Sequence, residues 1–265
     1  MGRRSLLRAP VLVATTGVVA AVAVLAAEVE VARRREYAVD PGFDIDALIP
    51  GDAPTIELVV AGDSTAAGLG VAAVAETLPV QIAERMARDT GRAVHVIGLG
   101  ASGAKVADVL RSQLPQVALA DALVIAVGSN DAVQMTNVGS LERDLERLLL
   151  DARAHVDVVV LGGAGRLDTP NFLPPLRQLV AWRARMVRAL QQRIAARCGC
   201  GFVDIGGDVA DRFAATTNHT SSDGFHPAAA GYGVWADALA DRAVELLPGA
   251  DTDSLGAGAS RQRLD

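Results

Sequence analysis

The chain has 265 residues and little of what several large classes of protein require. Aromatic residues make up 3% of it, and 25 basic residues are outnumbered by 31 acidic ones, which leaves a net charge of −6. Proteins that bind nucleic acids usually present a basic surface, often with aromatic side chains that stack on bases, so no nucleic-acid partner is expected. The two cysteines and four histidines show no ligand spacing for a metal ion, and no metal site or other cofactor is predicted.

Both cysteines lie in one short segment, Cys198-Gly199-Cys200. A single intervening residue brings the two side chains too close together for an unstrained disulfide, so two unpaired thiols at the end of a helix are expected. The cysteines therefore do not indicate the compartment in which the protein resides. The chain also lacks the Gly-x-Ser-x-Gly motif that carries the nucleophile of α/β-hydrolases.

A serine follows the first apolar segment of the central region. Residues Ile56–Ala61 read as a buried strand, and Gly62-Asp63-Ser64 come directly after it. Gly, Asp and Ser are all turn residues, so a purely structural turn is one interpretation. The other is that Ser64 is a nucleophile, because ligands bind at the carboxyl ends of strands in open α/β sheets.

A second apolar segment, Ala122–Val127, ends in Gly128-Ser129-Asn130-Asp131. Asn130 is therefore expected at the same edge of the sheet as Ser64. A side-chain amide at this edge can donate a hydrogen bond to an oxyanion, whereas an asparagine after a strand can also cap the next helix. Beside the serine motif, the functional interpretation is the stronger one.

An aspartate and a histidine lie three residues apart near the end of the chain. Asp223 can orient one nitrogen of the His226 imidazole, which leaves the other nitrogen free to accept a proton from a serine. The remaining histidines fit this role less well. His95 lies in an apolar strand pattern and His155 ends a helical stretch, so both are expected to be structural, and His219 is expected to be a surface loop residue.

These motifs, together with Ser102-Gly103, resemble in their order the four blocks of the SGNH hydrolases, also called GDSL esterases or lipases. The resemblance spans Ile56 to about Leu247, and the N-terminal features resemble those of membrane-anchored or exported actinobacterial members. It implies a metal-free acyl-transfer site with the following residues: Ser64 as nucleophile, His226 as base, Asp223 as orienting acid, and the N–H groups of Ser64 and Gly103 with the Asn130 side chain as oxyanion hole.

Strand-like and helical segments alternate along the central region, which indicates parallel βαβ units. The predicted strands are Ile56–Ala61, Ala93–Leu99, Ala122–Val127, Asp157–Leu161 and Gly201–Ile205. The predicted helices are Leu78–Asp89, Lys105–Leu114, Ser140–Ala154 and Leu176–Arg197. The resemblance implies a three-layer α/β/α sandwich with a parallel, five-stranded, flavodoxin-like sheet, and residues 56–247 are predicted to form this one domain.

The N-terminal region, residues 1–36, contains an uncharged stretch at 9–27 with arginines on both sides. The stretch is nearly long enough to cross a bilayer, so a single-pass membrane anchor is predicted, with the catalytic domain outside the cytoplasm. A cleaved signal peptide and a secreted protein form the first alternative. An ordinary helix packed on the domain is the second. Residues 37–55 are predicted as a linker and 248–265 as a disordered tail.

The predicted function is hydrolysis of a carboxylic ester of a lipid or acylated small molecule through an acyl-enzyme. One alternative is an acyltransferase that passes the acyl group to a sugar or lipid hydroxyl, and another is a binding domain without activity. The loop Gly162 to Pro175 has an apolar composition that fits either an acyl pocket or a packed connection. Nothing in the sequence indicates the oligomeric state.

Overall fold

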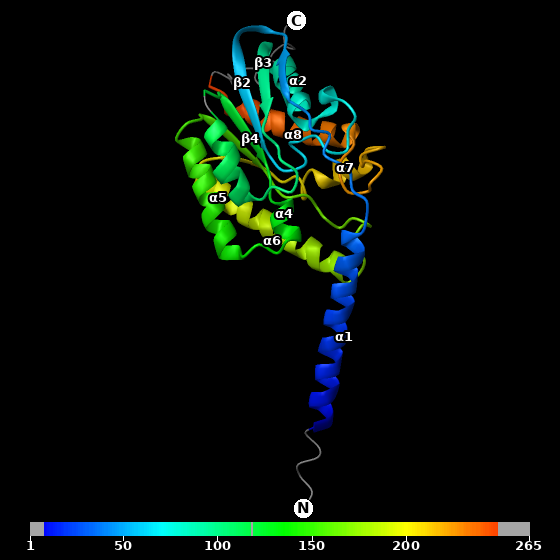
Figure 1. Cartoon of the computed structure of the whole chain (residues 1–265). Helices are drawn as coiled ribbons and strands as arrows, with labels where there is room; N and C mark the ends of the chain where they lie inside the picture. Colours follow the sequence, from blue (N-terminus) through cyan, green and yellow to red (C-terminus); the bar gives the residue numbers. More distant parts are fainter. Residues whose placement is uncertain (1–7, 118, 249–265) are drawn as a thin grey trace, which may run out of the picture.

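The protein is built around one mixed sheet that lies between two layers of helices (Figure 1). This computed structural model describes residues 8–117 and 119–248, with side chains from residue 20 onward. The strands are β1 (Asp46–Ile49), β2 (Asp52–Gly62), β3 (Arg92–Gly98), β4 (Ala122–Ala126), β5 (Val158–Gly162) and β6 (Gly201–Val203). The helices are α1 (Arg8–Arg33), α2 (Leu78–Thr90), α3 (Val106–Asp108), α4 (Ser129–Val133), α5 (Val138–Arg153), α6 (Leu176–Arg197), α7 (Ala210–Ala215) and α8 (Ala229–Leu246).

The sheet has the order β1-β3-β2-β4-β5-β6, and the five strands from β3 to β6 run parallel to one another. Counted along the chain, these five have the order 2-1-3-4-5 of a flavodoxin-like sheet. The prediction of a three-layer sandwich around such a sheet is therefore confirmed. Cys198 and Cys200 are free thiols, as predicted.

The sixth strand, β1, was not predicted. It pairs antiparallel with β3, and both β1 and the beginning of β2 lie in residues 37–55, which the sequence analysis assigned to a linker. His95 helps to hold β1 in place, because its Nε2 is 2.8 Å from Asp46 Oδ1 and its Nδ1 is 2.7 Å from Glu57 Oε2. A four-residue edge strand with no fully buried side chain leaves too weak a pattern to recognise from sequence.

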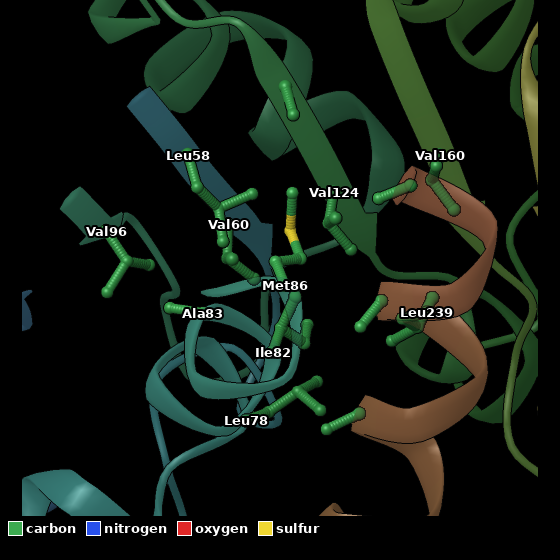
Figure 2. Close-up of a cluster of buried hydrophobic side chains, with 14 of the residues drawn as sticks. Leu58, Val60, Leu78, Ile82, Ala83, Met86, Val96, Val124, Val160 and Leu239 are labelled. Carbon is green, nitrogen blue, oxygen red and sulfur yellow. The ribbon is translucent and has the colours of Figure 1, made fainter. Parts of the chain in front are cut away.

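Alternate side chains of the strands point to the two faces of the sheet. On one face, Val60, Val124 and Val160 pack against Met86 of α2 and Leu239 of α8 (Figure 2). Each of these five side chains is almost completely removed from water. This core layer holds β2, β4 and β5 in register, and so determines where the carboxyl ends of these strands lie.

The other face is covered by α5 and α6. The leucines of α5 at positions 141, 145, 148 and 149, predicted as one apolar stripe, are at most 1% exposed, and they pack against Leu123 and Ile125 of β4. Because the central strands are buried on both faces, they read as continuous apolar runs, and their limits could be predicted to within a few residues.

The helix predicted from Lys105 to Leu114 is broken into three short pieces. After α3 come a π-helical turn, η2 (Val109–Gln113), and a 3₁₀ turn, η3 (Leu114–Gln116). The wider π turn directs the side chain of Gln113 inward, where it is 3% exposed and hydrogen-bonded to β2. This inward bond explains why a regular helix does not form here.

Helix α1 extends away from the sandwich, and its last turns meet the beginning of α6 (Figure 1). In these turns Leu25, Val29 and Ala32 pack against Leu176 and Val180 of α6. The end of α1 is therefore packed on the domain.

Among the residues whose side chains the structure describes, 20–117 and 119–248, no helix is both long and apolar enough to cross a membrane. The predicted membrane anchor at 9–27 is not confirmed, because residues 9–19 lie outside this part. The predicted tail also lies outside it from residue 249 onward.

Candidate active site

The structure brings the serine and asparagine motifs together at the carboxyl edge of the sheet. Strands β2 and β4 are neighbours, with Gly62 opposite Ala126, so Ser64 and Asn130 follow adjacent strands. A Cβ on Gly62 would lie 2.0 Å from the carbonyl oxygen of Ala126. Only glycine allows the two chains to approach so closely at this point, which explains the first residue of the Gly-Asp-Ser motif.

Ser64, His226 and Asp223 form one chain of hydrogen bonds. His226 Nε2 is 3.2 Å from Ser64 Oγ, and His226 Nδ1 is 2.7 Å from Asp223 Oδ2. A carboxylate only accepts hydrogen bonds, so Nδ1 carries the proton and Nε2 has its lone pair directed at the serine hydroxyl. Ser64 is 9% exposed and His226 is 6% exposed.

The carboxylate of Asp223 accepts five hydrogen bonds. Its Oδ1 accepts from Ser221 Oγ at 2.8 Å, Phe225 N at 2.8 Å and His226 N at 2.9 Å. Its Oδ2 accepts from His226 Nδ1 and from Ala38 N, the latter at 2.9 Å. Burial alone would raise the pKa of this carboxyl, but bonds from His226, Ala38 and Phe225 together hold the pKa well below its ordinary value. The ionised carboxylate can therefore stabilise a positive charge on His226.

The residues predicted for the oxyanion hole, Ser64, Gly103 and Asn130, follow the ends of β2, β3 and β4, and Asn130 lies in the first turn of α4. Asn130 borders the cavity beside Ser64, and its Nδ2 donates to Ala104 O at 3.0 Å. Gly103 precedes Ala104 in an exposed turn with a φ of +79°. Asn130 thus ties this turn to the sheet edge, although Gly103 is not among the described residues that line the cavity.

Two buried glutamines that the sequence analysis missed fasten the strand ends beneath these residues. Gln113 accepts from Gly62 N at 2.7 Å and donates to Gly62 O at 2.8 Å. Gln191 of α6 donates to Val127 O at 2.8 Å and accepts from Ala164 N at 2.9 Å. The only sequence signal for Gln191 is a polar residue at a core-facing position of an amphipathic helix.

Asp63 and Asp131, each next to a predicted site residue, are also buried. Asp131 is 1% exposed and accepts from Val106 N at 3.0 Å, which positions the segment after the Gly103 turn. Asp63 is 2% exposed and accepts from the backbone N and the Oγ1 of Thr65. Burial raises the pKa of Asp63 to about 6 against the lowering effect of these two bonds.

A cavity of about 470 Å³ opens beside Ser64 and His226. Ile205, Phe213 and Trp235 supply apolar lining from three different elements, and polar side chains contribute another part of the wall. The cavity lining also includes residues 165–170, so this part of the loop Gly162 to Pro175 belongs to the site. Phe172, in contrast, packs beneath α1 as part of a connection.

His219, predicted as a surface loop residue, is one of the residues that line the cavity. Its Nδ1 is 2.7 Å from Thr216 O, and its ring lies edge-to-face against Phe213 at 4.8 Å. His219 does lie in a loop and is partly exposed, and the contacts that turn its ring toward the cavity come from α7 and the loop that follows it. In residues 8–117 and 119–248, no group of three or more His, Cys, Asp or Glu side chains could hold a metal ion.

A serine hydroxyl, a histidine and a carboxylate in one hydrogen-bonded chain, at the carboxyl edge of a parallel α/β/α sheet, are the features of a serine hydrolase. The chain belongs to the GDSL-like Lipase/Acylhydrolase family, whose sequence profile matches residues 60–234. It is 31% identical over 190 residues to a GDSL-like esterase of Mycobacterium tuberculosis. That match covers 69% of this chain and 60% of the relative, so the chain spans about three fifths of the relative's length.

Two solved structures have a similar fold. A lipase/acylhydrolase from Enterococcus faecalis is similar with a TM-score of 0.57 and 22% identity, over 70% of this chain and 94% of that one. A carbohydrate acetylesterase family member from Sinorhizobium meliloti has a TM-score of 0.55 and 21% identity, over 72% and 99% of the two chains. Similarity at these identities shows the fold, and the sequence profile assigns the chain to the lipase/acylhydrolase family.

Proposed function

We propose that the protein is a serine esterase that hydrolyses carboxylic esters of a lipid or an acylated small molecule through an acyl-enzyme. One observation carries the proposal. The hydroxyl of Ser64 is in hydrogen-bond contact with His226, whose other nitrogen is hydrogen-bonded to the buried carboxylate of Asp223. Ser64 and His226 also line a cavity. A weak nucleophile is activated in this way in acyl-transfer enzymes.

In the first half of the reaction, Ser64 Oγ attacks the ester carbonyl carbon while His226 Nε2 takes the hydroxyl proton. The bond between the carbonyl carbon and the leaving oxygen then breaks, and the alcohol departs with the proton from Nε2. In the second half, water loses a proton to Nε2 and attacks the acyl-enzyme. The carboxylic acid leaves and the proton returns to Ser64 Oγ. Asp223 stays ionised and stabilises the imidazolium in both halves.

The negative charge on the carbonyl oxygen of the tetrahedral intermediate needs donors directed at it. Three donors fit this role in the proposal: the Asn130 side chain and the backbone N–H groups of Ser64 and Gly103. Asn130 has the strongest support, because it borders the cavity and one hydrogen of its Nδ2 remains for the substrate after the other is donated to Ala104 O. The turn that carries Gly103 is held by the same bond.

The lining of the cavity suggests how an ester would bind. An acyl chain fits the apolar lining formed by Ile205, Phe213 and Trp235, because apolar area removed from water favours binding. A polar alcohol moiety fits the part of the wall that carries Arg166 and His219. The same wall would suit a sugar hydroxyl as acyl acceptor, so acyl transfer is the second candidate function.

A fluorophosphonate probe followed by peptide mass spectrometry tests the nucleophile, and the label is expected on Ser64. Ser129→Ala is a matched control, because Ser129 also lines the cavity but its hydroxyl accepts a hydrogen bond from Gly165 N. Labelling should persist in this control, and labelling of any serine other than Ser64 would overturn the assignment.

The fate of the acyl group separates the two candidate functions. A series of p-nitrophenyl esters of increasing acyl length, turned over with and without a polyol, should release free acid as the main product. An acylated polyol formed in preference to free acid would replace hydrolysis by acyl transfer.

A further inference from the structure

The polypeptide segment that follows α1 reaches the carboxylate of Asp223, which lies at the end of the proposed catalytic series Ser64, His226 and Asp223. The N–H of Ala38 donates to Asp223 Oδ2 at 2.9 Å, between residues 185 positions apart in sequence. The same oxygen accepts from His226 Nδ1 at 2.7 Å. Ala38 therefore contacts the one carboxylate oxygen that orients the histidine.

The two oxygens of Asp223 are held by different parts of the protein. Oδ1 accepts its three bonds from the residues of its own loop, Ser221 to His226. Among the described residues, Oδ2 accepts only from His226 itself and from Ala38. The loop alone thus positions one oxygen. The orientation of the other, and with it the direction of the bond to the imidazole, depends on a donor from the N-terminal region.

The segment that leads to this donor is held in place by two contacts. In α1, the buried carboxylate of Glu28 accepts from Leu176 N at 2.8 Å, at the first residue of α6. Next to Ala38, the ring of Tyr37 lies edge-to-face against Phe225 at 5.4 Å. Figure 1 shows the end of α1 against α6, just before the chain turns toward the sheet. The donor is therefore part of a segment that is anchored at two points.

We propose that residues 28–38 are a positioning element for Asp223, so that ester turnover depends on the docking of the end of α1 against α6. The proposal rests on the proposed function, because it assigns Asp223 the role of orienting acid. A change that separates α1 from α6 would move Ala38 away from the carboxylate and lower the rate of the chemical step. Substrate binding would change little, because residues 28–38 do not line the cavity.

Ala38→Pro in the full chain tests the hydrogen bond directly, because proline has no backbone N–H. The kcat is expected to fall about 10-fold with little change in KM, since a hydrogen bond to a charged group contributes on this scale. Ala38→Gly keeps the N–H and should retain nearly all of the activity. Wild-type kcat in Ala38→Pro, with activity lost in Asp223→Ala, would overturn the proposal.

A double-mutant cycle separates positioning from local distortion by the proline. In an Asp223→Ala background the N–H of residue 38 has no carboxylate to hold, so Ala38→Pro should cause no further loss of the residual activity. An equal loss in both backgrounds would show that the proline acts through the backbone and would overturn the proposal.

Glu28 provides a test far from the carboxylate. Glu28→Ala removes the acceptor for Leu176 N and is expected to lower kcat several-fold, whereas Glu28→Gln keeps a carbonyl oxygen and should restore most of it. Equal activities of Glu28→Ala and wild type would contradict the coupling between α1 docking and turnover.

A substrate-free measurement distinguishes failure of this proposal from failure of the proposed function. The proton on His226 Nδ1, in its bond to Asp223, is expected as a downfield resonance in NMR spectra of the wild type. Ala38→Pro should shift or broaden this resonance and Ala38→Gly should not. An unchanged resonance would overturn the positioning role even if the protein is an esterase. A shifted resonance in a protein without ester turnover would instead overturn the proposed function.

Discussion

The two sides of the proposed catalytic chain are held in different ways. Ser64 follows a central strand whose last residue is bonded on both its N–H and C=O to the buried side chain of Gln113. Asp223 and His226 lie instead in a loop, and their orientation depends on hydrogen bonds within that loop and from Ala38. The proposed nucleophile is therefore part of the core, whereas the proposed acid and base are positioned by a hydrogen-bond network at its edge.

This difference predicts which substitutions affect stability. Changes beneath the nucleophile remove buried hydrogen bonds of the sheet and should lower the free energy of unfolding. Changes of the acid and base remove chemistry at a loop and should lower the rate while the protein stays folded.

Ser64→Ala is expected to lower kcat/KM for ester hydrolysis on the order of 10⁶-fold, because nucleophile and base act as a unit. The free energy of unfolding should change little, since only one hydroxyl is removed. Activity with a p-nitrophenyl ester and thermal unfolding measure the two quantities. Retained turnover would remove Ser64 from the proposed mechanism.

Asp223→Asn should lower kcat by roughly 10³–10⁴-fold, because an amide does not hold the imidazole tautomer or stabilise the imidazolium as a carboxylate does. His226→Ala should lose more. Steady-state kinetics of both variants, with circular dichroism as the check on folding, make the comparison. A silent Asp223→Asn beside an inactive His226→Ala would mean that Ser64 and His226 act without the carboxylate.

Asn130→Ala is expected to lower kcat by roughly 10²–10³-fold with a smaller change in KM, the usual result of removing one preorganised oxyanion donor. The substitution also removes the bond to Ala104 O, so the turn that carries Gly103 loses a support. A raised KM with unchanged kcat would make Asn130 a residue that binds the ground state of the substrate.

Gln113→Ala should lower the free energy of unfolding by about 1–3 kcal/mol, because the buried N–H of Gly62 loses its partner, while Gly62 O keeps the bond from Ala101 N. Gln116→Ala, three residues later on the exposed side, is the matched control and should change stability little. Denaturant unfolding of both variants gives the comparison. Equal stabilities would contradict the view that Gln113 holds the nucleophile side.

Asp63→Asn should stabilise the protein more at pH 8 than at pH 4. The folded pKa of Asp63 is raised from 3.8 to about 6, so its contribution to stability is present below the lower value and is lost as pH rises through about 6. The difference corresponds to about 3 kcal/mol. An amide oxygen can still accept both bonds from Thr65. Unfolding curves that show no pH dependence in the difference between variant and wild type would contradict this.

The same difference separates the elements that could be predicted from the sequence from those that could not. Central strands buried on both faces are visible as apolar runs, and short motifs at their ends carry their own chemistry, so Ser64 and Asn130 could be placed at one sheet edge. The edge strand β1 could not be derived, because its four residues are partly or fully exposed and form no clear pattern. The docking of α1 could not be derived either, because an apolar helix can pack in several ways.

By itself, the sequence determined the sandwich, the order of its parallel strands through the family resemblance, and the set of side chains proposed for catalysis. The alternation of strands and helices and the site motifs follow from residue type and local period, which every segment carries independently of the others, whereas the strand order follows from the resemblance alone. Only the tertiary structure decided that Gln113 holds Gly62, that His219 lines the cavity, and that Ala38 donates to Asp223. The physical reason is that a backbone N–H is the same in nearly every residue, so the partner it finds 185 positions away depends on how the chain packs.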